Sequence, residues 1–174
     1  MEKDNHPLHK YIAKIVSAEF KDSKISCDSE CYVRKIDKNL NSLCYEKDRE
    51  KSEFSQADMI ILKDNKIKVI IEIEDSNVTP NQACGKVLAA ALARYCFPKR
   101  GEAHKGISNS VLFIQVLNKD KMKSKGNKKH QLKLLEKAID DKIKFSKIKE
   151  YKLYSFSTKD HCHKMIKEIR EFLK

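Results

Sequence analysis

The hydrophobic pattern divides the first third of the chain into helix-like and strand-like segments. Apolar residues recur at helical spacing between Leu8 and Phe20, which predicts a first helix. The next segment, Lys24–Lys35, places single apolar residues between polar ones, and we interpret it as a first strand. The segment Asp37–Ser55 is charged and has little apolar periodicity, so we expect an exposed connection or a short helix there.

The clearest local pattern is a β-hairpin from Asp58 to Glu74. Its first strand is the apolar run Met59–Leu62, and its second strand, Ile67–Glu74, alternates and is rich in β-branched residues. Lys63-Asp64-Asn65-Lys66 separates the two strands, and Asp and Asn tolerate the positive φ that tight hairpin turns require. The sequence therefore predicts two antiparallel neighbouring strands.

The remaining pattern predicts helices alternating with strands. Thr79 and Pro80 are typical of an N-cap and a first helical position, and the helix they open continues to about Tyr95. Because this helix is apolar nearly all round, we expect it to be central and packed on a sheet. The later elements are a strand at Ser110–Leu117, a basic loop at Asn118–His130, a helix at Gln131–Ile139, a strand at Glu150–Ser157 and a helix at His161–Leu173.

The predicted order α β β β α β α β α is that of an α/β protein with a mixed central sheet flanked by helices. We expect one domain over residues 1–174, with a core at about 8–117 and a C-terminal α β α extension at about 131–173. The chain has 174 residues and is 40% hydrophobic, which is enough for a core. Its longest clean apolar run, Val87–Ala93, is far shorter than a membrane-spanning helix.

Charge and the N-terminal residues narrow the function classes. The first residues contain acids and no apolar stretch, so we expect no signal peptide and an intracellular, cytoplasmic protein without a membrane partner. The net charge of +12 favours a polyanionic partner such as nucleic acid. The alternative is compositional, since the chain is rich in Lys, Ile and Asn together and most of its cations are Lys.

Three acids converge at one end of the predicted hairpin. Counting inward from the turn places Asp58 beside Glu72, and opposed residues have Cβ atoms roughly 5 Å apart. Strand alternation places Glu72 and Glu74 on one face. The other face carries the apolar residues Ile67, Val69, Ile71 and Ile73.

Such a group of carboxylates needs a cation, because neighbouring like charges repel and a buried unpaired carboxylate is costly. Oxygen ligands without sulfur suit Mg²⁺, Mn²⁺ or Ca²⁺ rather than Zn²⁺. Such an ion polarises a phosphodiester and lowers the pKa of an attacking water. The structural alternative is that Asp58 caps a strand while Glu72 and Glu74 point to solvent.

These residues resemble the motif of the PD-(D/E)XK nuclease superfamily. Asp58 stands at the head of one strand, and Val69-Ile70-Ile71-Glu72-Ile73-Glu74 follows on the next, before a helix. The resemblance implies a core of a helix, a three-stranded meander, a crossing helix and a further strand. It also implies that Asp58, Glu72 and the Ile73 backbone carbonyl bind Mg²⁺ or Mn²⁺, and that the protein is an endonuclease hydrolysing DNA.

The chain departs from this motif at Glu74, which stands where the superfamily usually has Lys. The resemblance is therefore to restriction endonucleases with the Glu-x-Glu variant, in which the last acid completes the metal site or orients the water. Lys86, on the following helix, is a candidate for a migrated cation, against a solvent-facing or capping Lys. Glu19, on the first helix, is a candidate additional metal ligand, against an ordinary surface Glu.

Candidate DNA contacts surround this motif. Thr79 and Gln82 lie at a helix N-terminus, where free N–H groups bind phosphate. Further candidate phosphate contacts, with ordinary solvated charge as their alternative, are Lys86, Lys99, Arg100, Lys125, Lys128 and Lys129.

The expected partner is double-stranded DNA, cut by a homodimer because two strands need two sites. A restriction-type enzyme is the first interpretation. A structure-selective, junction-resolving nuclease and an inactive nucleic-acid-binding protein with a nuclease-like core remain the alternatives.

Overall fold

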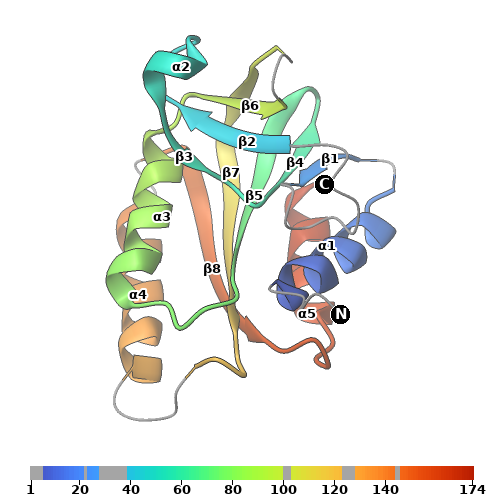
Figure 1. Cartoon of the computed structure of the whole chain (residues 1–174), viewed down its shortest axis with the longest axis vertical. Coiled ribbons are helices and arrows are strands. Elements are labelled where there is room, and N and C mark those ends of the chain that lie inside the picture. Colours follow the sequence, from blue (N-terminus) through green and yellow to red (C-terminus); the bar gives the residue numbers. More distant parts are fainter. Residues whose placement is uncertain (1–5, 22, 28–38, 100–102, 123–127, 144–145) are drawn as a thin grey trace.

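One mixed β-sheet runs through the protein, with helices on both of its faces (Figure 1). The computed structural model describes residues 6–21, 23–27, 39–99, 103–122, 128–143 and 146–174. The helices are α1 (Pro7–Glu19), α2 (Arg49–Ser52), α3 (Pro80–Leu92), α4 (Lys128–Ile143) and α5 (His163–Phe172). The strands are β1 (Lys24–Cys27), β2 (Asn39–Cys44), β3 (Glu53–Gln56), β4 (Met59–Lys63), β5 (Lys66–Glu74), β6 (Tyr95–Lys99), β7 (Lys105–Asn118) and β8 (Ile148–Phe156).

The predicted meander forms one end of the sheet. β1 pairs antiparallel with β4, and β4 pairs antiparallel with β5. The chain then crosses through α3, forms β6 and returns as β7, which runs parallel to β5, and β8 is parallel to β7 on its other side. The predicted α/β class and the mixed sheet are confirmed.

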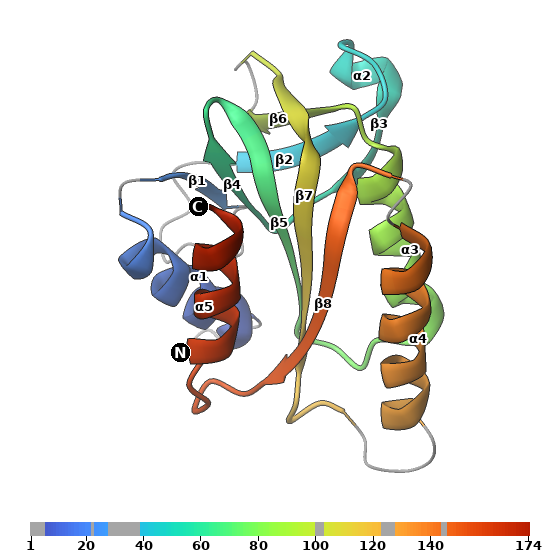
Figure 2. The same cartoon turned by 180° about the vertical axis from the view of Figure 1, so that it is seen from behind.

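Two apolar cores lie on opposite faces of the sheet. Residues of α1 and α5 such as Ile12 and Met165 pack with Ile71 on one face. On the other face, Val87 of α3 packs with Ile70. The rear view shows this separation, with α1 and α5 on one side of the sheet and α3 and α4 on the other (Figure 2). The end of β5 therefore lies between α1 and α3.

The hairpin turn has the predicted geometry. Asp64 and Asn65 have φ of 52° and 57°, the left-handed conformation that a two-residue hairpin turn requires. The pairing register shifts between Ile61 and Leu62. Because of this shift Ile67 packs in the core under α3, so its expected place on the Val69 face is wrong. Ile71 and Ile73 do share that face with Val69.

The segment 37–55 was expected to be an exposed connection or a short helix; its described part, from residue 39, contains a short helix but is otherwise mostly strand, so the exposed connection is wrong. It forms β2, the short helix α2 and β3, and β2 pairs with both β3 and β6. Leu43 and Cys44 are fully buried in β2, but so are the polar residues Asn41 and Ser42. Buried polar residues hide the two-residue hydrophobic period, which explains why the pattern did not predict a strand.

Several predicted bounds and one helix face also differ. α3 ends at Leu92, and residues 95–99, expected as helix end and loop, form β6. Its buried residues are Ala83, Val87 and Ala90, whereas Leu88 is 57% exposed and Leu92 55% exposed. α3 is therefore amphipathic rather than apolar all round. β1 ends at Cys27, and residues 28–38 of the expected first-strand region lie outside the described residues.

Among the described residues, no helix combines the length and the apolar character needed to cross a lipid bilayer.

Candidate active site

A pocket of about 300 Å³ lies where β4 begins and β5 ends. Its walls come from the start of α1, from the β4–β5 hairpin and from α3. The residues that line it are His6, His9, Asp58, Ile73, Glu74, Asp75, Ser76 and Lys86. Acidic, basic and imidazole side chains from separate parts of the chain thus meet at one opening.

Asp58 lies beside the second strand of the hairpin, as predicted. Met59 pairs with Ile71, so Asp58 stands opposite Glu72 in the antiparallel register. Its Oδ2 accepts a hydrogen bond from the Ile73 backbone N–H at 2.5 Å. This bond fixes the Asp58 carboxylate at the pocket, where 15% of the side chain is exposed.

Asn41 holds the backbone around Asp58. The Ala57 N–H donates to the Asn41 carbonyl at 3.1 Å, and Asn41 Nδ2 donates to the Asp58 carbonyl at 3.4 Å and to the Ser26 carbonyl at 3.3 Å. Asn41 is fully buried and has φ of 38°, a conformation that Asn tolerates better than most residues. This residue of β2 therefore positions the turn of chain from which Asp58 projects.

Glu72 is buried and ion-paired. Lys86 Nζ lies 2.8 Å from Glu72 Oε2, while Oε1 has no hydrogen-bond partner among the described residues. Burial and the neighbouring charge of Asp58 raise the pKa of Glu72 to about 8, against the opposing effect of Lys86. The alternative that Glu72 points to solvent is wrong, because its side chain is 1% exposed.

A buried amide stands next to Glu72 on the neighbouring strand. Gln115 of β7 pairs with Glu72 in the parallel register, and both side chains are fully buried. The Tyr151 hydroxyl donates to Gln115 Oε1 at 2.6 Å, whereas Gln115 Nε2 has no partner among the described residues. An unpaired acceptor on Glu72 and an unpaired donor on Gln115 therefore occur at adjacent positions of the sheet.

Lys86 reaches the acids from α3. Burial acts to lower its pKa, but the charge and hydrogen bond of Glu72 outweigh burial, so the pKa of Lys86 is raised. Glu74 lies on the same side of the pocket, and burial raises the pKa of its carboxyl while Lys86 opposes that shift. The structure thus brings Asp58, Glu72, Glu74 and Lys86 together at one site.

His9 and Asp75 belong to this site but were not predicted. His9 Nδ1 lies 2.9 Å from Asp75 Oδ2, and His9 Nε2 lies 3.5 Å from Asp58 Oδ2. Burial acts to lower the pKa of His9, yet the two carboxylates outweigh it and raise the pKa to about 9. The available signal was weak: Asp75 directly follows the motif, and His6 and His9 are three positions apart at a helix start.

Side chains of the protein itself supply part of the positive charge that offsets the acids of the pocket. We expected the acids to need a divalent ion, but Lys86 and His9 already supply positive charge to Glu72 and Asp58. The raised pKa of Glu72 shows that these cations do not fully compensate the buried acids.

The acids offer oxygen donors, but the three predicted carboxylates do not form one close group: among the described residues, the group of three potential ligands within 4.8 Å of one another is His6, His9 and Asp75. Asp58 and Glu74 offer carboxylate oxygens on the pocket wall, and the unpaired Oε1 of Glu72 is a third oxygen donor. Oxygen donors of this kind are those that Mg²⁺ and Mn²⁺ prefer. The backbone carbonyl of Ile73 is a candidate fourth ligand, since Ile73 also lines the pocket.

The structure places the other candidates elsewhere or in structural roles. Glu19 lies at the opposite end of α1 from His9, where it pairs with Arg170 at 2.8 Å, so it is not brought to the acids. Thr79 and Gln82 form a capping box at the start of α3, in which each side chain accepts from the other's backbone N–H. Arg100 and Lys125 lie outside the described residues, as do the side chains of Lys99, Lys128 and Lys129.

Comparisons of the chain with protein-family models, with curated proteins and with solved structures found no match.

Proposed function

We propose that the protein is a metal-dependent nuclease that hydrolyses phosphodiester bonds of DNA. The observation that carries the proposal is the 2.8 Å contact between Lys86 Nζ and Glu72 Oε2 beside Asp58. The motif lacks its strand lysine because Glu74 takes that position. A lysine from α3 supplies the missing charge at the same acids, so two acids and a lysine are present together.

The order of the central elements supports this proposal. Helix α1, the meander β1–β4–β5, the crossing helix α3 and the parallel strand β7 follow the order that the resemblance implies. Asp58, just before β4, stands opposite Glu72 of β5; Asp58 lines the pocket, whereas Glu72 is fully buried. β2, α2 and β3 form an insertion between β1 and β4 that leaves this order intact.

Each residue of the site has a role in phosphodiester hydrolysis. Asp58, Glu72 and the Ile73 carbonyl would hold Mg²⁺ or Mn²⁺, which supplies Lewis-acid activation of the phosphate and of the attacking water. Glu74 orients the water and accepts its proton, since its carboxyl is on the pocket wall. Lys86 stabilises the negative charge that develops on the phosphate oxygens, as a preorganised cation does.

The substrate class follows from charge. A net charge of +12 favours a polyanion, and phosphate contacts position such a substrate without reading its sequence. The proposed substrate is double-stranded DNA, and the proposed assembly is a homodimer. A restriction-type endonuclease is the first interpretation. Cleavage of branched DNA in preference to one linear site would instead identify a structure-selective nuclease.

Plasmid cleavage tests the proposal. Purified protein is incubated with supercoiled plasmid and Mg²⁺ or Mn²⁺, and we expect nicked and linear products that EDTA abolishes. Asp58→Asn removes a charged ligand, so it should abolish cleavage. Asp64→Asn makes the same chemical change in the turn of the same hairpin, where Asn tolerates the positive φ, and should cleave like the wild type.

Two outcomes would contradict the proposed nuclease activity at this site. Retarded migration of DNA without cleavage in any metal would identify a binding-only protein, in which Lys86 and Glu72 form a plain ion pair. Equal cleavage by wild type and Asp58→Asn would place the activity at another site or in a contaminant.

A further inference from the structure

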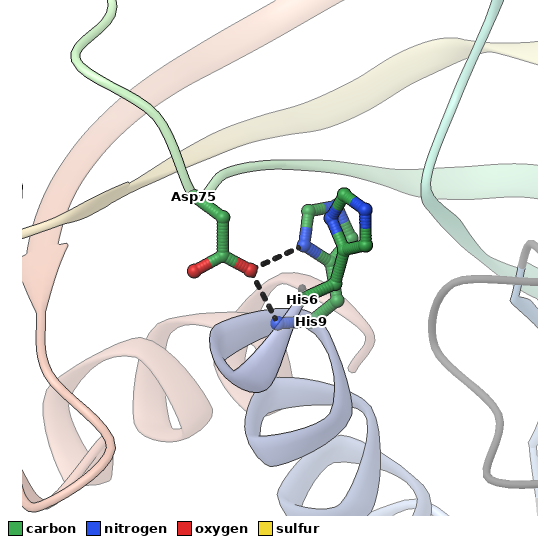
Figure 3. Close-up of side chains that lie close together, drawn as sticks. All are labelled: His6, His9 and Asp75. Atoms are coloured by element: carbon green, nitrogen blue, oxygen red, sulfur yellow. Dashed lines mark hydrogen bonds and ion pairs between the residues drawn. The ribbon is translucent and has the colours of Figure 1, made fainter. Parts of the chain in front are cut away.

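A second group of possible metal ligands lines the same pocket, at the start of α1 and directly after β5. His6 is the N-cap residue of α1 and His9 lies three positions later, so both imidazoles project from one face of the helix start. The ligand atoms of His6, His9 and Asp75 all lie within 4.8 Å of one another. Figure 3 shows the two rings beside the Asp75 carboxylate, with one carboxylate oxygen facing His9.

The spacing of these atoms matches metal ligation. His9 Nδ1 and Asp75 Oδ2 are 2.9 Å apart. Two ligands at right angles, each about 2.1 Å from a metal ion, are separated by about 3.0 Å. An ion between these two atoms takes the place of the proton that they share in the metal-free protein, and His6, whose ligand atom lies within 4.8 Å of both, completes three ligands by moving closer.

A buried amide orients the carboxylate of this group. Asn118 Nδ2 donates to Asp75 Oδ1 at 2.8 Å, which leaves Oδ2 facing the histidines. The sheet register explains the contact, because Glu74 pairs with Leu117 and the next residues on each strand are Asp75 and Asn118. Outer-shell hydrogen bonds of this kind fix the orientation of metal ligands and raise metal affinity.

The chemistry of the group differs from that of the acidic site beside it. Two imidazole nitrogens and one carboxylate oxygen suit Zn²⁺, Co²⁺, Ni²⁺ or Mn²⁺ and disfavour Mg²⁺. Three protein ligands on the wall of an open pocket leave positions for water or substrate, as in catalytic metal sites. We infer that His6, His9 and Asp75 bind a transition-metal ion in the pocket next to Asp58.

A structural role for Asp75 is the competing explanation. The His9 backbone N–H donates to Asp75 Oδ2 at 3.4 Å, so the carboxylate also serves as the anion at the N-terminus of α1. That role does not use His6, which makes His6 the residue that separates the two explanations.

Binding of this ion does not depend on the proposed function, but its use in hydrolysis does. His9 Nε2 lies 3.5 Å from Asp58 Oδ2, so an ion on the histidine side would neighbour one held by Asp58 and Glu72. The His9 ring stands between the two ions, because Nδ1 faces Asp75 and Nε2 faces Asp58, so they lie farther apart than the roughly 3.5–4 Å at which two ions clamp the attacking and leaving oxygens. The inference thus extends the proposed site from one ion to two of different chemistry.

A Co²⁺ titration tests the inference. Protein without a polyhistidine tag is titrated with Co²⁺ in the presence of excess Mg²⁺, and binding is followed by the visible absorption of the bound ion. We expect one Co²⁺ per chain that excess Mg²⁺ does not displace and that Zn²⁺ does. His6→Gln should weaken Co²⁺ binding by at least about tenfold, and Asn118→Ala by about 10–100-fold through the lost orientation of Asp75.

Matched controls come from two exposed histidines elsewhere. His161 and His163 stack with ring centroids 5.3 Å apart and are an alternative pair of imidazole ligands. His161→Gln and His163→Gln should leave the Co²⁺ affinity unchanged, and thermal melts check that every variant is folded. Loss of Co²⁺ binding in these variants, or full affinity in His6→Gln, would overturn the assignment.

The same titration separates this inference from the proposed function. Mg²⁺-dependent plasmid cleavage without Co²⁺ binding at His6 would overturn the second metal and leave the nuclease in place. Co²⁺ binding that His6→Gln weakens, in a protein that cleaves no DNA, would support the metal site and overturn the nuclease.

Discussion

Lys86 Nζ is 2.8 Å from Glu72 Oε2, although one residue lies on α3 and the other on β5. α3 crosses the sheet between β5 and β7, so a lysine on its inner side reaches a carboxylate of the strand below. β5 carries Glu74 where the motif that it resembles has a lysine, and a lysine of α3 lies at the acids instead. The proposed activity depends on that substitute cation.

Removing the substitute cation should slow catalysis. We expect Lys86→Met to lower the cleavage rate by about 10²–10³, the usual effect of removing one preorganised charge-stabilising group. Lys133→Met, a matched change on the exposed face of α4, should leave the rate unchanged. Rates of plasmid nicking under saturating Mn²⁺ measure this. Wild-type rates in Lys86→Met would show that Lys86 takes no part in the reaction.

Metal affinity should rise with pH. The pKa of Glu72 is about 8, so at neutral pH a metal ion must displace a proton from this carboxyl. The apparent affinity for Mn²⁺ should therefore increase from pH 6 to about pH 8 and then level off. Calorimetric titrations in buffers of different ionisation enthalpy should show proton release at pH 7. A pH-independent affinity over this range would exclude Glu72 as a ligand.

The metal-free protein should become less stable as pH rises. The native state keeps a proton on Glu72 between the ordinary carboxyl pKa of 4.5 and about 8, and on His9 between 6.5 and about 9. In both windows the native state binds more protons than the unfolded chain, so the free energy of unfolding falls with rising pH. The Tm should therefore decrease from pH 6.5 to pH 8.

Glu72→Gln provides the control for this pH dependence. The amide keeps the size of the side chain and removes its titration, so the decrease in Tm over the same range should be shallower. An identical slope in wild type and Glu72→Gln would contradict the raised pKa of Glu72.

Asn41 should affect the site through Asp58. Asn41→Gly keeps the positive φ at little cost but removes the hydrogen bonds to the Asp58 and Ser26 carbonyls. We expect a loss of stability of about 1–2 kcal/mol and a weaker affinity for Mn²⁺. Asn41→Ala should destabilise further, because Ala is strained at positive φ. Unchanged Mn²⁺ affinity in a folded Asn41→Gly protein would mean that Asn41 does not position Asp58.

Local patterns predicted the hairpin and its acids. The turn at Asp64 and Asn65 follows from residue type, and the antiparallel register then places Asp58 beside Glu72. The bulge that moves Ile67 to the other face has no counterpart in the alternation of the sequence.

Contacts between distant parts of the chain were harder to predict. His9 and Asp75 are 66 positions apart, and only the packing of α1 across the end of β5 brings them together. β2 and β6 pair through Leu43 and Cys96, and buried Asn41 and Ser42 in β2 do not follow a hydrophobic pattern. Lys86 was identified only as a candidate, because helical spacing alone does not show which strand residue lies beneath a helix.

The position of a bound Mn²⁺ decides whether Asp58 and Glu72 form a metal site. Crystals grown with Mn²⁺ give an anomalous difference peak wherever the ion binds. We predict a peak within about 2.2 Å of carboxylate oxygens of both Asp58 and Glu72. A peak elsewhere on the protein, or none at millimolar Mn²⁺ while Glu72 keeps its contact with Lys86, would contradict this prediction.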